Sequence, residues 1–275
     1  MDLWTISSIF VFRDKSMNLK FSKYHGSGND FIMVDNRDEN YSFEPVEINE
    51  LCKRRKGIGA DGLILIENAP NADFKMIYFN ADGFIGSMCG NGGRCAVSFA
   101  KNLGIIIKNQ CKFFAFDGIH HARYVDKGNV SLKMTDVTLV EKLNKGWKLD
   151  TGSPHLILFR DSISQLNVKY EGFTIRNSDD FVKKGINVNF VELNHGELYI
   201  RTYERGVEDE TLSCGTGAVA SAIVACESDL LNKQKIKVNT LGGQLEVSFS
   251  RHGSTYSDIH LIGPTQFVFN GEVDV

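Results

Sequence analysis

A short cysteine-glycine motif occurs twice in this 275-residue chain, and each copy opens an apolar, helix-like run. The first copy, at residues 89–92, reads Cys-Gly-Asn-Gly, and the second, at residues 214–217, reads Cys-Gly-Thr-Gly. The two cysteines are 125 positions apart, nearly half the chain. A strand-like run and a glycine turn precede each copy, at residues 76–83 and 198–206. A unit of strand, loop, cysteine and helix that is used twice predicts two pseudo-equivalent halves.

The composition is typical of a globular protein, with 42% hydrophobic and 24% charged residues and a formal net charge of −3. This balance excludes disordered and collagen-like chains. The lack of net positive charge argues against a nucleic-acid partner. The longest apolar candidate, residues 218–226, has about half of the roughly 20 residues that a membrane-spanning helix needs. We therefore expect neither nucleic acid nor membrane as a partner.

Residues 1–16 are interpreted as an N-terminal extension outside the fold, either an upstream start or a disordered tail before a native start at Met17. Asp2 disrupts the basic region of a signal peptide, and no small-x-small cleavage site precedes Met17. The six cysteines include no Cys-x-x-Cys pair, and the seven histidines show no zinc-ligand spacing. These features favour reduced thiols in the cytoplasm and no metal site.

Strand-like runs outnumber helical ones too heavily for alternating β-α units. Helices are predicted at residues 44–55, 91–103, 161–166 and 216–231. We expect an α+β fold of curved, mostly antiparallel sheets wrapped around a few buried helices. The apolar run 218–225 lacks a polar stripe, which predicts a helix buried on most sides. The strand-like runs are residues 18–24, 31–35, 63–67, 74–79, 112–116, 122–125, 130–134, 156–159, 188–193, 198–203, 244–249 and 259–262.

A thiol at a helix N-terminus lies beside unpaired N–H groups and the positive end of the helix dipole. Such a thiol commonly has a pKa of about 3.5–7.5 instead of about 8.5, so Cys89 and Cys214 are expected to ionise readily. The neighbouring glycines allow backbone N–H groups to bind a carboxylate. Two sulfurs on opposite sides of one cleft suit inversion of a stereocentre, since one removes a proton and the other delivers one. A non-catalytic dithiol redox or binding protein is the alternative.

With these motifs, the chain resembles the diaminopimelate epimerases from about residue 17 to the C-terminus. The order and spacing of the motifs follow that family throughout. The segments that carry the resemblance are residues 23–31 (KYHGSGNDF), 57–61 (GIGAD), 79–83 (FNADG), 89–95 (CGNGGRC), 152–155 (GSPH), 203–206 (YERG) and 213–217 (SCGTG).

The resemblance implies a cofactor-independent isomerase that interconverts L,L- and meso-diaminopimelate, on the route to lysine and peptidoglycan precursors. It also implies two barrel-like halves, each a curved sheet around a central helix. We place residues 17–133 plus 262–275 in the first half, which carries Cys89, and residues 134–261 in the second, which carries Cys214. The expected partner is a small amino-acid substrate, and a homodimer is possible.

By the same resemblance, Cys89 and Cys214 are the catalytic acid/base pair. His155 and Glu204 would tune the thiols or orient the substrate amino group. Arg94 and the basic cluster at residues 53–56 are interpreted as surface charges and left out of the site. The residues that would bind substrate are Asn29, Asn80, Gly90, Asn91, Asn187, Glu204, Arg205, Gly215 and Thr216.

Two positions depart from the family pattern. Gly62 stands where the family commonly has Gln, and Ser153 where it commonly has Asn. Both positions face the substrate by analogy, so the departures bear on which amino acid is bound more than on the reaction type. A related two-thiol racemase or epimerase acting on proline or hydroxyproline is therefore kept as an alternative.

Overall fold

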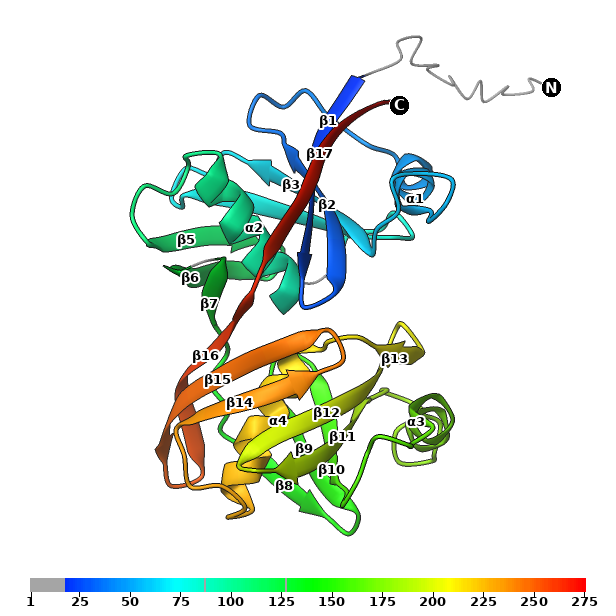
Figure 1. Cartoon of the computed structure of the whole chain (residues 1–275), viewed down its shortest axis with the longest axis vertical. Coiled ribbons are helices and arrows are strands. Elements are labelled where there is room, and N and C mark those ends of the chain that lie inside the picture. The colour runs from blue at the N-terminus through cyan, green and yellow to red at the C-terminus, as the bar shows by residue number, and fades with distance from the viewer. Residues whose placement is uncertain (1–17, 87, 127) are drawn as a thin grey trace, which may run out of the picture.

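A computed structural model describes residues 18–86, 88–126 and 128–275 of the chain. The predicted extension, residues 1–16, lies outside these described residues, as does Met17. The described part folds into two sheet-and-helix halves, one above the other in Figure 1, which the long strands near the C-terminus connect. The predicted α+β class, with curved and mostly antiparallel sheets in two halves, is confirmed.

The first half contains a curved sheet and two helices. Its elements are β1 (Asn18–Gly26), β2 (Asn29–Asp35), α1 (Pro45–Cys52), β3 (Gly62–Glu67), β4 (Phe74–Asn80), α2 (Gly90–Asn102), β5 (Gln110–Ala115), β6 (Gly118–Asp126) and β7 (Asn129–Lys133). Strand β17 (Gln266–Asp274) returns from the end of the chain and pairs antiparallel with β1.

The second half repeats this plan. Its elements are β8 (Val140–Leu143), β9 (Gly146–Asp150), β10 (Pro154–Phe159), α3 (Val168–Arg176), β11 (Asn187–Asn194), β12 (Glu197–Glu204), β13 (Asp209–Thr211), α4 (Gly215–Glu227), β14 (Lys235–Thr240), β15 (Gly243–His252) and β16 (Thr255–Pro264).

The strand pairing shows the internal repeat directly. In the first half, β2 and β3 are parallel and joined through α1, and β4 and β5 are parallel and joined through α2. In the second half, β10 and β11 are joined through α3, and β12 and β14 through α4, again in parallel. Parallel neighbours need a long crossover rather than a tight turn, so each helix lies at an equivalent place in its half.

Strand β16 pairs with β15 of the second half and with β7 of the first, and the chain then continues into β17 beside β1 (Figure 1). The sheet is thus continuous from one half to the other. The division at residues 133/134 and 261/262 stays a prediction, for which the return of β17 to β1 is the supporting observation.

Helices α2 and α4 are the centres of their halves. Helix α2 contacts β1, β2, β3, β4, β6, β7 and β16, and α4 contacts β9 to β12 and β14 to β16. Residues 90–100 of α2 are all buried, as are residues 215–226 of α4 except Thr216. The predicted all-round burial of residues 218–225 is confirmed. Because sheets enclose both helices, the cysteine that precedes each helix is held in a fixed place.

The third helix does not lie where the sequence predicts it. Residues 161–166 form turns, and α3 begins after Asn167, whose side chain accepts a hydrogen bond from the N–H of Tyr170 at 3.1 Å. The Arg201 Nη1 donates to the carbonyls of Ile163 and Leu166 at 2.8 and 2.9 Å. These contacts hold residues 163–166 against β12 outside the helix, so tertiary contacts override the local pattern.

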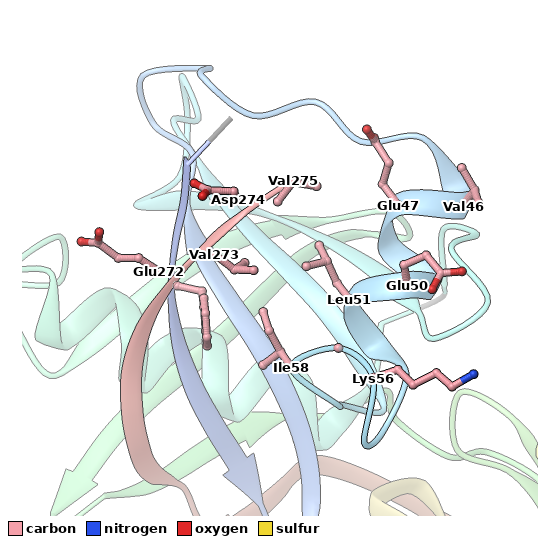
Figure 2. Close-up of a pocket in the computed structure, with 12 residues that line it drawn as sticks. Val46, Glu47, Glu50, Leu51, Lys56, Ile58, Glu272, Val273, Asp274 and Val275 are labelled. Carbon is pink, nitrogen blue, oxygen red and sulfur yellow. The ribbon is translucent and has the colours of Figure 1, made fainter. Parts of the chain in front are cut away.

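A hollow of about 640 Å³ lies between α1 and the end of β17, and Figure 2 shows the side chains that line it. Apolar side chains such as Leu51, Ile58 and Val273 lie within it, and Glu47 and Lys56 are at its edge. None of the predicted site residues lines this hollow.

Candidate active site

A cleft of about 740 Å³ is lined by residues of both halves, and it gathers almost every residue that the sequence predicts for the site. Both predicted catalytic cysteines are in its wall. His155 is the exception, since it does not line the cleft. The predicted residues that do line it are Asn29, Asn80, Cys89, Gly90, Asn91, Asn187, Glu204, Arg205, Cys214, Gly215 and Thr216.

The two cysteines occupy equivalent positions, each as the N-cap residue of a central helix. Cys89 precedes α2 and Cys214 precedes α4, both with extended backbone and neither with a side-chain cap. The two helix starts meet: a Cβ added at Gly215 would lie 3.9 Å from the Cα of Gly90 and 2.8 Å from Leu261. The N-terminal residues of both helices therefore line one cleft, where a helix N-terminus favours an anion.

Side chains of the first half hold the Cys89 thiol. Its Sγ lies 3.5 Å from the Oδ1 of Asn29, to which the Nδ2 of Asn91 also donates at 3.3 Å. The other end of the Asn29 amide donates to Asp61 at 2.7 Å, and Asp61 in turn pairs with Arg54 at 2.8 Å. Asn29 is thus oriented by a charged network, with its oxygen toward the thiol.

A different network surrounds Cys214. Its Sγ lies 3.5 Å from the Oγ1 of Thr216, which lies 2.9 Å from the Nε2 of His155. The Nδ2 of Asn189 donates to His155 Nδ1 at 3.0 Å, which leaves the hydrogen on Nε2. His155 therefore lies behind Thr216 and reaches the sulfur only through that hydroxyl. Glu204 borders Cys214 directly. Burial raises the pKa of its carboxyl, and the hydrogen bonds from Thr211 and Cys214 lower it by less.

The predicted lowering of the thiol pKa values is wrong for the free site. Burial raises the pKa of both Cys89 and Cys214, and the negative charge of Glu204 raises each further. Backbone N–H groups of Gly92 and Gly217 act in the opposite direction, as expected at a helix start. Desolvation outweighs them because burial disfavours the charged thiolate more than these N–H groups favour it. Both thiols are therefore protonated near neutral pH.

Asn187 connects Arg205 and Ser153 in the wall of the cleft. The Asn187 Oδ1 accepts from the backbone N–H of Arg205 at 2.8 Å, and its Nδ2 donates to Ser153 Oγ at 3.1 Å. Ser153 Oγ also lies 3.0 Å from His155 Nε2. Ser153, one of the two positions that depart from the family pattern, is thus part of the hydrogen-bond network around His155.

Sequence reasoning missed Tyr78, which lines the cleft two residues before Asn80 on the same face of β4. A Cβ added at Gly62 would lie 2.6 Å from Tyr78 Cε2, and one at Gly86 2.6 Å from its Cε1. The Tyr78 ring therefore fills the space that a side chain at position 62 would need. The alternation with Asn80 along the strand is the signal that could have identified it.

Sequence reasoning also left two basic side chains out of the site. Arg54 belongs to the predicted solvated cluster and its side chain is 59% exposed, but it also lines the cleft and pairs with Asp30 at 2.7 Å and with Asp61 at 2.8 Å. Arg94, interpreted as a surface charge, is fully buried. The surface interpretation of Arg94 was wrong because a helix-periodicity argument does not show which polar side chains other strands will cover.

Among residues 18–86, 88–126 and 128–275, no group of three His, Cys, Asp or Glu side chains gathers as a metal site. In the same described part of the chain, no helix is long and apolar enough to cross a membrane.

The fold is shared with solved structures of low sequence identity. A phenazine biosynthesis protein of the PhzF family from Bacillus anthracis superimposes with a TM-score of 0.74 at 13% identity, covering 94% of this chain and 100% of that one. A hydroxyproline epimerase from Agrobacterium vitis gives 0.65 at 14% identity, covering 94% and 91%. The chain thus has the two-halved fold that these proteins share.

Comparison with related sequences identifies one family among the proteins of this fold. The diaminopimelate epimerase family model matches residues 21–140 and 148–268. The diaminopimelate epimerase of Flavobacterium psychrophilum is 51% identical over 253 residues, covering 91% of this chain and 98% of that protein. That of Aquifex aeolicus is 38% identical over 276 residues, covering 93% and 98%. The chain belongs to the diaminopimelate epimerase family.

Buried His155 is expected to make the fold sensitive to acid. Burial lowers its pKa from 6.5 to about 3, so between these values the unfolded chain binds a proton that the folded chain does not. The free energy of unfolding therefore falls as the pH drops below 6.5, by about 2 kcal/mol from this residue at pH 5. Urea unfolding at pH 7 and pH 5 should show a smaller loss for His155→Asn than for the parent. Equal losses in both proteins would contradict this assignment.

Proposed function

We propose that the chain is an isomerase that interconverts L,L- and meso-diaminopimelate without a cofactor, with Cys89 and Cys214 as the acid/base pair. This reaction belongs to the synthesis of lysine and peptidoglycan precursors. The observation that carries the proposal is the meeting of two cysteine-capped helix starts in one cleft, in a chain of the diaminopimelate epimerase family.

In the proposed mechanism, the substrate α-carboxylate binds to the N–H groups at the starts of α2 and α4. The thiolate on one side takes the α-hydrogen as a proton, and the electron pair remains on the carbon and spreads into the carboxylate. The thiol on the other side then gives its proton to the opposite face. The reverse reaction exchanges the two roles, so each cysteine serves one face.

One thiol must lose its proton before the reaction begins. Glu204 lies against Cys214, and burial raises the pKa of its carboxyl above the usual value, which makes it a suitable acceptor for the Cys214 proton. The substrate ammonium group would add positive charge to the same cleft. Together with the helix N-termini, that charge favours a thiolate that the empty site disfavours.

The decisive experiment is incubation of the reduced protein with L,L-diaminopimelate and separation of the stereoisomers. The proposal requires formation of meso-diaminopimelate until the two isomers reach equilibrium. Proline and trans-4-hydroxyproline are tested in parallel, because the structure of a hydroxyproline epimerase shares this fold. Conversion of either imino acid but not of diaminopimelate would replace the substrate assignment, and conversion of none would reject the enzyme.

We further propose that the protein works in the cytoplasm as a homodimer. The reaction uses reduced thiols, which the cytoplasm maintains. Strand β17 carries the exposed apolar side chains Phe267, Val268 and Phe269, a surface that a second copy would cover. Light scattering after size exclusion should give twice the mass of one chain, and a monomer at micromolar concentration would contradict the dimer.

Air oxidation is expected to inactivate the protein through a Cys89–Cys214 disulfide. Both thiols line one cleft, and a closure that brings their Cα atoms within about 7 Å allows the bond. The two thiols lose two hydrogens to oxygen, and because thiolate is the reactive form, inactivation should be faster at higher pH. Dithiothreitol should restore activity. Loss of activity with both thiols still titratable would contradict the disulfide.

A further inference from the structure

Arg94 is a charged side chain buried where the two halves meet. Its exposed fraction is 0%. The Nη1 donates to the carbonyl of Gly90 at 3.2 Å, and the Nη2 donates to Asn91 Oδ1 at 2.9 Å and Ser27 Oγ at 3.4 Å. The buried Nε has no hydrogen-bond partner among the described residues. Within that same part of the chain, no carboxylate forms an ion pair with this guanidinium.

The backbone leaves a space for this guanidinium. A Cβ added at Gly263 of β16 would lie 3.1 Å from Arg94 Nε and 3.2 Å from its Cζ. One added at Gly26 of β1 would lie 3.5 Å from its Nη2 and 3.1 Å from the carbonyl oxygen of Asn91. Neither glycine has a positive φ, so these positions need a glycine for space rather than for backbone conformation.

The guanidinium also fixes the orientation of one amide. Because Asn91 Oδ1 accepts from Arg94, the Nδ2 of Asn91 faces the opposite way. It donates to Asn29 Oδ1 at 3.3 Å and to the carbonyl of Ser213 at 3.1 Å. Asn29 contacts the Cys89 thiol, and Ser213 directly precedes Cys214. Arg94 thus supports the surroundings of both thiols through a single side chain.

A buried ion without a counter-charge is strongly unfavourable. The negative charges that arise near Arg94 in the proposed reaction are the Cys89 thiolate and the substrate carboxylate, both at the start of α2. Arg94 lowers the pKa of Cys89, although less than burial raises it.

We propose that Arg94 is a positioning residue for the reaction proposed above. Its buried positive charge stabilises the negative charge that the site acquires on Cys89 and on the bound carboxylate, and its guanidinium holds the Asn91 amide.

The test compares Arg94→Lys, which keeps the charge, with Arg94→Gln, which removes it but keeps an N–H donor for Asn91. The readout is the rate of Cys89 alkylation by iodoacetamide as a function of pH, followed by peptide mass spectrometry without substrate. Arg94→Gln should raise the apparent pKa of Cys89 by about one unit, which slows alkylation about tenfold below that pKa. Arg94→Lys should stay within about threefold of the parent rate. Because no substrate is present, this result is independent of the diaminopimelate assignment.

Ser98→Ala is the matched control, because Ser98 lies on the same helix as Arg94. The substitution removes a buried hydrogen bond between Ser98 and Thr265 without changing the charge. Its alkylation profile should equal that of the parent. If Arg94→Gln does not fold, Arg94→Met serves as the neutral variant, because apolar residues often replace buried charges without loss of the fold. A folded neutral variant whose Cys89 profile matches those of the parent and Arg94→Lys would overturn the proposal. Steady-state assays should show a lower kcat and a higher KM in the neutral variant only.

Discussion

The variants Cys89→Ser and Cys214→Ser are each expected to lower kcat/KM for diaminopimelate epimerisation by at least about 10³-fold. A serine hydroxyl keeps the size and the N-cap position of the thiol. It is too weak an acid to ionise at neutral pH, even beside unpaired helix N–H groups. In the free protein burial already raises the pKa of both thiols, so a group of still higher pKa would not form the base. Chiral chromatography of the reaction mixture measures the loss.

Cys226→Ser is the matched control for these variants. Cys226 lies at the other end of α4 from Cys214, and its Sγ donates to the carbonyl of Lys233 at 3.1 Å, a hydrogen bond that serine can also make. Its activity should remain within about threefold of the parent. Near-normal epimerisation by either Cys89→Ser or Cys214→Ser would remove the two-thiol mechanism.

Product formed in D₂O should carry deuterium at the inverted carbon from the first turnover. One thiol removes the substrate proton and the opposite thiol, which has exchanged with solvent, delivers a deuteron. Recovered starting isomer should carry little deuterium at early times, since the thiol that took its proton returns that same proton before exchange. Mass spectrometry of both isomers below 5% conversion measures the two labels.

The single variants extend this measurement. Cys89→Ser and Cys214→Ser should each retain at most a slow exchange of the α-hydrogen, on the face that the remaining thiol serves. Undeuterated product at early times would instead indicate one base that serves both faces. Such a base would return the abstracted proton to either side, and the second cysteine motif would then have no catalytic role.

Local patterns predicted most of the fold. Helices α1, α2 and α4 lie close to their predicted ranges because each has a clear start: Pro45 in α1, and a cysteine followed by glycine in the other two. Strands β8, β9, β13 and β14 were not predicted, and the return of residues 262–275 to the first half was expected from the family resemblance and not from a local strand pattern. Strand β17 has little burial of its own and exists because β1 offers it a partner, and such a partner is not visible in a local sequence window.

The candidate site divides in a similar way. Helix-start chemistry pointed to Cys89, Cys214 and the glycines that follow them, and the family resemblance implied the other cleft residues. Tyr78 and Arg54 were missed because their place in the cleft depends on which strands and loops meet around them. Gly62 illustrates the difference, since only the packing of Tyr78 against it shows what fills the position.

The sequence by itself therefore determined the internal repeat, the two cysteine-capped helices and the family of this protein. Each of these is a matter of residue order and of helix-start chemistry, which neighbouring residues control. Only the tertiary structure decided how Cys89 and Cys214 are charged and that Arg94 is buried. Desolvation controls these properties, and it depends on which distant strands cover a side chain. The helix dipole favours a thiolate, but the enclosing sheets make the neutral thiol the resting form.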